Sequence, residues 1–105
     1  MLIYEVNLTV DTDVAAAFAD WLSPHIHEVV RVGKFLSARW CERDSATDDE
    51  NEKQLWTIHY TVPDRACLDA YLTHHAPRLR EDGQQRFGGH FTATRRVLTI
   101  REEVR

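Results

Sequence analysis

Two segments of the chain alternate between apolar and polar side chains, and this alternation constrains the fold more than any other feature. In residues 2–10 every even position is apolar, and the odd positions are polar from residue 5 onward. Residues 55–62 repeat the pattern, again with apolar side chains at the even positions. A period of two indicates a β-strand with one buried face and one face that meets water, a partner or a ligand. The polar positions are Glu5, Asn7, Thr9, Thr57, His59 and Thr61.

Apolar residues at helical spacing follow the first strand, over residues 14–30. Residues 11–13 precede this run and are expected to supply N-cap oxygens and negative charge at the start of the helix. Pro24 predicts either a kink or the start of a second helix with Ser23 as its cap. Gly33 is the expected end of the helix.

A second helical region is expected after the strand over residues 55–62. Asp64 is the expected N-cap of one helix, and Ala76–Pro77 predicts the start of another that stops at Gly88–Gly89. Residues 44–52 hold five acidic residues and almost no apolar ones, which predicts a solvated hairpin loop. The expected strands cover residues 2–10, 34–42, 55–62 and 90–101.

The order strand, helix, strand, strand, helix, strand predicts an α+β, ferredoxin-like βαββαβ fold. In that fold a four-stranded antiparallel sheet carries its helices on one face only, and residues 1–105 form a single domain of this kind. The helices are expected to cover the apolar face of the two alternating strands. The opposite face therefore lacks cover from this chain, and it is the first place to look for a partner or a ligand.

Composition excludes several classes of function. The chain has a formal net charge of -4, which argues against binding nucleic acid or anionic lipid. No apolar stretch approaches the roughly 18 residues of a membrane span, and no signal peptide is visible. Cys41 and Cys67 form no metal-binding or redox motif, so we expect two free thiols in a cytoplasmic protein. An RNA recognition motif would need aromatic residues on the face of the sheet that the helices leave uncovered. In this chain the aromatic residues of the two alternating strands lie on the apolar face instead.

Several segments resemble a small, uncharacterised bacterial family. They are Tyr71–Arg80, Arg86–Gly88, Met1–Tyr4 with Asn7, and the run from Trp21 to Phe35. This family is catalogued as domain-of-unknown-function family 4286, within the ferredoxin-like dimeric α/β-barrel superfamily. The resemblance extends over nearly the whole chain and implies a homodimer whose two sheets face each other to form a barrel. It implies no activity.

The wider superfamily includes cofactor-free monooxygenases, haem-degrading enzymes, isomerases and proteins without known catalysis, so the fold alone does not select a function. The haem-degrading group carries an Asn on the first strand and a Trp and a His in the later helical region. Asn7 matches the first of these, but Tyr71 stands where the Trp would be, and residues 78–87 contain no histidine. This departure argues against haem oxygenation.

The polar face supplies the first set of candidate ligand-binding residues. His59 is the one weak catalytic candidate, because a neutral imidazole can act as acid or base near physiological pH. Either Arg95 or Arg96 is expected on this face, depending on the strand register. Two outcomes remain open: a network of ion pairs that sets the register of a dimer, or a polar cavity that holds an anion. The candidates are Glu5, Asn7, Arg39, His59 and Arg95.

A second candidate pocket lies between the helices and the sheet, where the chain places many large rings for so small a core. Imperfect packing of such rings can leave a slot for a ligand. These rings are Tyr4, Trp21, Trp56, Tyr60 and Tyr71.

We expect no metal site and no cofactor. His25 and His27 point about 200° apart on a helix, and His25 with Glu28 supplies only two ligands. The expected protein is thus a cytoplasmic homodimer that binds a small molecule in a polar barrel or in the sheet–helix pocket. Two alternatives stay open: a cofactor-independent enzyme of the monooxygenase or isomerase kind, and a structural dimer without catalysis.

Overall fold

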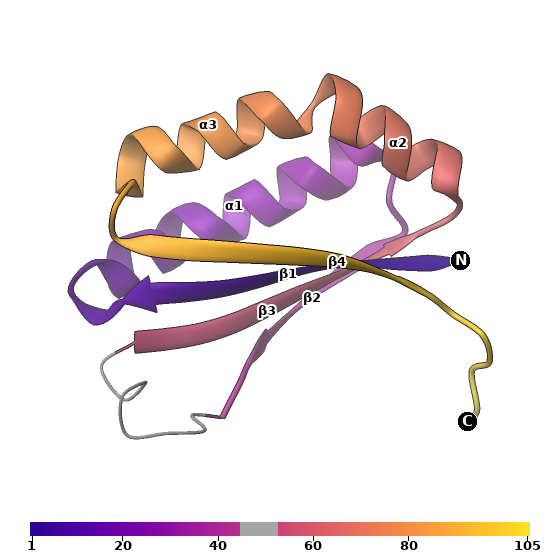
Figure 1. The fold of residues 1–105 in the computed structure, drawn as a ribbon, viewed down its shortest axis with the longest axis horizontal. Helices are drawn as coiled ribbons and strands as arrows, with labels where there is room; N and C mark the ends of the chain where they lie inside the picture. The colour runs from indigo at the N-terminus through magenta and orange to yellow at the C-terminus, as the bar shows by residue number, and fades with distance from the viewer. Residues whose placement is uncertain (45–52) are drawn as a thin grey trace.

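A computed structural model describes residues 1–44 and 53–105 of the chain. Within these residues the expected order of elements is confirmed, and Figure 1 shows a layer of helices above a sheet. The strands are β1 (Leu2–Asp11), β2 (Ser37–Glu42), β3 (Lys53–Val62) and β4 (Phe91–Thr99). The helices are the short 3-10 turn η1 (Thr12–Val14), α1 (Ala15–Gly33), α2 (Arg65–His74) and α3 (Ala76–Phe87).

The four strands form one antiparallel sheet in the order β2-β3-β1-β4, which confirms the ferredoxin-like fold. The two alternating strands, β1 and β3, occupy the centre of the sheet. Their register places Tyr4 opposite Tyr60 and Glu5 opposite His59. The apolar positions of both strands therefore share one face, and the polar positions share the other.

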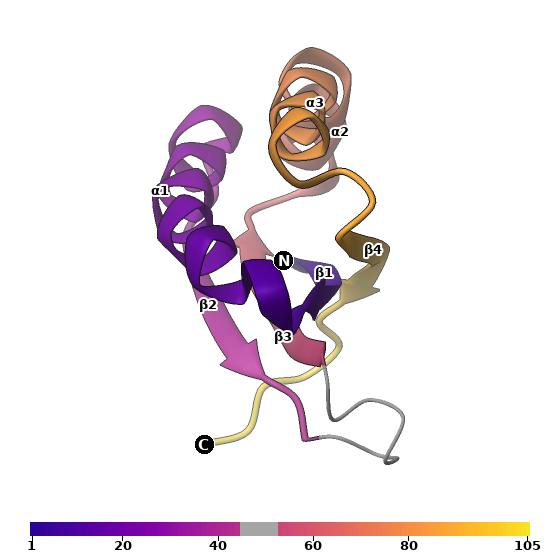
Figure 2. The same ribbon diagram turned by 90° about the vertical axis from the view of Figure 1, so that its left-hand side faces the viewer.

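All three α-helices lie on the apolar face, as the two views in Figures 1 and 2 show. The core forms between the helices and this face, because each element buries one apolar stripe there. Its largest fully buried side chains are Phe18, Ile58, Leu68, Val10, Val29 and Val62. The opposite face carries no helix, so we call it the open face.

The start of α1 differs from the sequence expectation, whereas its end does not. Asp11 makes no side-chain capping hydrogen bond, and its carboxylate instead pairs with Lys53 and lies 3.4 Å from His90 Nδ1. Pro24 lies inside one continuous helix, so no second helix starts there. Gly33 is the last helical residue, as expected. A Cβ at this position would lie 2.8 Å from the Phe35 ring, so close packing requires the glycine.

The strand expected over residues 34–42 begins only at Ser37. Lys34 adopts a left-handed conformation with φ of 56°, and the amide of Phe35 donates to the carbonyl of Val30. These contacts close the end of α1 and delay the strand. The acidic loop expected over residues 44–52 lies, apart from Asp44, outside the described residues.

The expectations for α2 and α3 are confirmed. The Asp64 carboxylate accepts the Cys67 amide at 2.9 Å, which makes it the N-cap of α2. Pro77 stands in the first turn of α3, where its missing N–H has no cost. Gly88 ends this helix, and Gly89 takes a φ of 86° that favours glycine. In the described part of the chain, no helix is both long and apolar enough to span a bilayer.

Candidate functional site

Glu5 is the centre of a hydrogen-bonded network on the open face. His59 Nε2 lies 2.7 Å from Glu5 Oε1, Asn7 Nδ2 donates to Glu5 Oε2 at 2.9 Å, and the Arg96 guanidinium pairs with the same carboxylate. Only 4% of Glu5 is exposed, because these polar neighbours lie over it. The network thus joins three adjacent strands, β3, β1 and β4.

This arrangement keeps Glu5 ionised. The Arg96 hydrogen bond, followed by those of Asn7 and His59, lowers the pKa of the Glu5 carboxyl to about 2, against the opposing effect of desolvation. An ionised carboxylate can only accept hydrogen bonds, so the His59 ring must carry a proton on Nε2. His59 is therefore positioned by Glu5 with its other ring nitrogen unused by the described residues.

Arg43 extends the network and was missed by the sequence analysis. Its guanidinium donates to Thr57 Oγ1 at 3.1 Å, to the Leu8 carbonyl at 3.3 Å and to the Trp56 carbonyl. Thr57 Oγ1 in turn donates to Asn7 Oδ1 at 2.6 Å. Strand alternation could have identified Arg43, because it follows Arg39 and Cys41 at alternate positions and therefore lies on the same face of the sheet.

The remaining sequence candidates separate onto the two faces of the sheet. Arg39 stands opposite His59 on the open face, and both line a groove of about 330 Å³ that also borders Ile100 and Glu103 of the C-terminal segment. Arg95 pairs in register with Val6 and therefore lies on the helix side. The placement of Arg95 beside Glu5, Asn7 and His59 was wrong. Arg96 holds that position.

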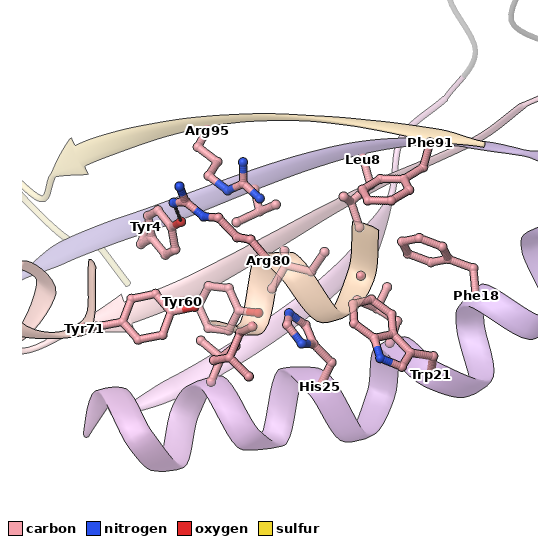
Figure 3. A pocket seen from close by; sticks show the side chains of 16 residues that line it. Tyr4, Leu8, Phe18, Trp21, His25, Tyr60, Tyr71, Arg80, Phe91 and Arg95 are labelled. Carbon is pink, nitrogen blue, oxygen red and sulfur yellow. Dashed lines mark hydrogen bonds between the residues drawn. The ribbon is translucent and has the colours of Figure 1, made fainter. Parts of the chain in front are cut away.

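A cavity of about 50 Å³ lies between the helices and the sheet (Figure 3). Four of the five rings predicted to surround such a pocket line it, and Trp56 packs instead against Phe18 and Trp40. The four rings are Tyr4, Trp21, Tyr60 and Tyr71. We call this space the helix–sheet cavity.

Two arginines from different elements line the same cavity. Arg80 of α3 reaches toward the sheet, where its Nη2 donates to the Tyr4 hydroxyl oxygen at 2.9 Å. Arg95 of β4 also lines the cavity, and Figure 3 shows both guanidinium groups on the Tyr4 side of it. Both side chains belong to exposed residues, so they stand at the mouth rather than in the interior.

His25 and two tyrosines of the cavity are neutral at physiological pH, and burial shifts the pKa of each further toward the neutral form. Desolvation, assisted by the nearby charge of Arg95, lowers the pKa of His25 to about 4, so its imidazole is uncharged. Burial also raises the pKa of Tyr60, and raises that of Tyr71 to about 12. The positive charge of the cavity therefore comes from its two arginines.

The far wall of the cavity is held in place by contacts of Trp21. Its indole Nε1 donates to Asp82 Oδ2 at 3.0 Å, and its ring stacks on His25 with 4.4 Å between ring centroids. Gly83 faces this ring so closely that an added Cβ would lie 3.1 Å from the indole. These contacts tie α1 to α3 across the cavity.

Within residues 1–44 and 53–105, no group of three or more His, Cys, Asp or Glu side chains is arranged to hold a metal ion. Glu28, the second ligand considered with His25, is engaged by Arg31 through contacts of 2.6–3.1 Å. Cys41 and Cys67 are free thiols.

The chain belongs to the family described as Domain of unknown function (DUF4286), whose model matches residues 1–101. No curated protein matches the sequence.

Several solved structures share the fold. SnoaB of Streptomyces nogalater, a cofactor-independent oxygenase solved as a point mutant, is 13% identical with a TM-score of 0.70, over 98% of this chain and 96% of that one. A dimeric ferredoxin-like protein from an uncultured marine organism is 14% identical with a TM-score of 0.69, over 98% of both chains. A putative antibiotic biosynthesis monooxygenase from Nitrosomonas europaea is 17% identical with a TM-score of 0.65, over 97% of this chain and 100% of that one. At these identities the likeness shows the fold alone.

Proposed function

We propose that this protein binds a small organic molecule in the helix–sheet cavity. The observation that carries the proposal is the set of polar groups that converge on an aromatic space: Arg80, Arg95 and His25. A cavity that served packing alone would be lined by apolar groups, whereas here two exposed arginines stand at the mouth and a histidine lines the interior. Apolar walls with a few convergent polar groups are the usual composition of a ligand site.

The cavity must widen to admit a ligand. Its volume of about 50 Å³ is enough for one or two water molecules, whereas a cavity of roughly 150 Å³ holds benzene in a well-studied engineered protein. Arg80 and Arg95 are exposed and stand at the mouth, so we propose that their side chains move aside as a ligand enters and that the side chains lining the cavity shift to give it room. A ligand would then enter from the edge formed by α3 and β4.

The larger groove beside His59 is less suited to hold a ligand by itself. It lies on the open face, and we propose that this face meets the same face of a second copy to form a homodimer. One-sided cover of the sheet supports this proposal, and so does the dimeric ferredoxin-like neighbour. Val104, at 81% exposure, lies in a C-terminal segment that passes on the open-face side and would gain cover from a second copy.

A second candidate function is cofactor-independent catalysis on the bound molecule. The candidate base is His25, whose uncharged imidazole lines the cavity; its pKa of about 4 makes it a weak base, which only a strongly acidic O–H of the ligand would protonate. SnoaB is described as a cofactor-independent oxygenase. For this chain we propose only the proton transfer to His25.

A thermal-shift screen with small aromatic compounds tests the binding proposal. A ligand that binds the folded state raises the melting temperature as its concentration exceeds its Kd. Gly83→Leu places a side chain against Trp21 and should remove the shift, whereas Gln84→Ala, on the exposed side of the same helix, should retain it. Circular dichroism of both variants checks the fold. A shift that persists in a folded Gly83→Leu protein would place binding elsewhere and overturn the proposal.

A further inference from the structure

We infer that the ligand of the helix–sheet cavity is a planar aromatic carboxylate, whose anionic group is held by Arg80 and Arg95 beside the Tyr4 hydroxyl. This inference rests on the proposed function and names the chemical class of its ligand. It begins from the position of Arg95 in the sheet.

Arg95 interrupts an apolar row. The positions of β4 that face the helices are Phe91, Ala93, Arg95 and Val97, and the register sets Arg95 opposite Val6. A charged side chain at such a position is unfavourable in an ordinary core, and it is tolerated here because β4 is an edge strand with an exit to solvent. The packing of β4 thus provides no reason for an arginine at this position.

Neither arginine of the cavity has an acidic partner among the described residues. Arg80 donates to the phenol of Tyr4, and Arg95 makes no side-chain hydrogen bond or ion pair within residues 1–44 and 53–105. Elsewhere in the same part of the chain, five of the other nine arginines pair with carboxylates. These pairs are Arg31–Glu28, Arg65–Asp69, Arg86–Asp82, Arg96–Glu5 and Arg105–Glu103.

Two guanidinium groups on one cavity, neither with an acidic partner in the part of the chain that the structure describes, favour a bound anion. Each guanidinium presents a planar fork of donors that matches the two oxygens of a carboxylate. Asp82 of α3 is already engaged by Trp21 and Arg86. Since His25 and Tyr71 are neutral, neither adds a charge that would compete with or repel an incoming anion.

The aromatic side chains that line the cavity favour a planar ring for the part of the ligand that is not the carboxylate. Trp21, Tyr60, Tyr71 and Phe91 line the same cavity and offer aromatic surface, with Trp21 and Phe91 at the end away from the two arginines (Figure 3). Once the cavity has widened, a flat ring can pack between such faces and bury apolar area, while its carboxylate remains near the mouth. The small volume of the cavity favours a single ring over a fused ring system.

A matched pair of probes tests the inference: benzoate and benzamide, which have nearly the same shape and differ in charge. Affinities are measured by calorimetry and thermal shift with the full chain, the variants Arg80→Gln and Arg95→Gln, and the control Arg78→Gln. Arg78 is exposed on the same helix and does not line the cavity. We expect benzoate to bind at least about tenfold more tightly than benzamide, the effect of one charge-assisted hydrogen bond.

Each cavity variant should lose the preference for benzoate while keeping its affinity for benzamide, which also shows that the variant is folded. Arg78→Gln should keep the preference. Equal binding of the two probes to the unmodified chain would overturn the anion inference and leave the proposed function intact. Failure of both probes to bind at millimolar concentration would contradict both.

Discussion

Glu5 and His59 face each other across β1 and β3, with 2.7 Å between Glu5 Oε1 and His59 Nε2. The contact lies on the open face, whereas His25 and the two cavity arginines lie on the helix side. The sheet therefore separates two polar centres with different character. One is a network satisfied within the chain, and the other is a cationic cavity whose arginines have no acidic partner in residues 1–44 and 53–105.

Substitution of Glu5 should show the stabilising effect of the open-face network. The folded-state pKa of about 2 lies below the ordinary value of 4.5. The stabilising contribution of the ionised Glu5 carboxylate is therefore fully present above about pH 4.5 and is lost as pH falls toward 2. We expect Glu5→Gln to lower the free energy of unfolding by about 1–2 kcal/mol at pH 7, since solvent screens the partly exposed Arg96 and His59. Urea unfolding at several pH values measures this, and a difference that is constant with pH would contradict it.

The homodimer proposal predicts a particle of twice the 12.2 kDa chain mass by light scattering. Glu5→Lys would place a cation beside Arg96 and His59 in each copy, and we expect it to give a monomer by charge repulsion. Glu81→Lys, on the exposed side of α3, makes the same change in net charge and should remain dimeric. A monomeric parent protein would contradict the proposal directly.

The lowered pKa of His25 predicts a second contribution to the loss of folding stability at low pH. Its folded-state pKa of about 4 lies below the ordinary value of 6.5, because burial and Arg95 outweigh the attraction of Asp82 and Glu28. Folding thus becomes less favourable as pH falls from about 6.5 toward 4, on the order of 2 kcal/mol. His25→Phe keeps a ring against Trp21 and should remove this component. NMR titration of the His25 ring with a midpoint near 6.5 would show the prediction to be wrong.

Gly83 should tolerate even a methyl group poorly. Alanine would gain about 1 kcal/mol of helix propensity. Its Cβ, however, would lie 3.1 Å from a Trp21 ring that is fixed by Asp82 and packed against Phe18. Overpacking of this kind costs about 1–3 kcal/mol, so we expect Gly83→Ala to lower stability by roughly 1 kcal/mol. An increase in the melting temperature of Gly83→Ala would contradict this prediction, because it would mean that the Trp21 ring can shift to make room for the methyl group.

The strands, the helices and the composition of both faces were predictable because they depend on local periodicity. Alternation in β1 and β3 placed Glu5, Asn7 and His59 on one face before any pairing was known. The aromatic pocket was likewise predictable in outline from its rings. Local pattern was sufficient wherever one face of an element is apolar and the other polar.

The positions of Arg95 and Arg96 were not predictable, because the stretch around them lacks clear alternation and only pairing with β1 determines the side. The reach of Arg80 to Tyr4 joins residues 76 positions apart and depends on how α3 packs. The loss of the Asp11 cap has a similar cause, since Lys53 of a neighbouring strand takes its carboxylate. The positions of these side chains therefore depend on contacts between residues that are far apart in the chain, which local sequence patterns do not reveal.

The most direct test of ligand binding in the helix–sheet cavity is an NMR titration of the labelled protein with benzoate. The three tryptophans provide separate indole N–H signals, of which only that of Trp21 lies at the cavity. We predict that benzoate shifts the Trp21 indole signal and the amides of His25, Gly83 and Arg95 while leaving those of Glu5, Asn7 and His59 unchanged. Shifts confined to the open-face residues, or no shifts at saturating benzoate, would contradict the account.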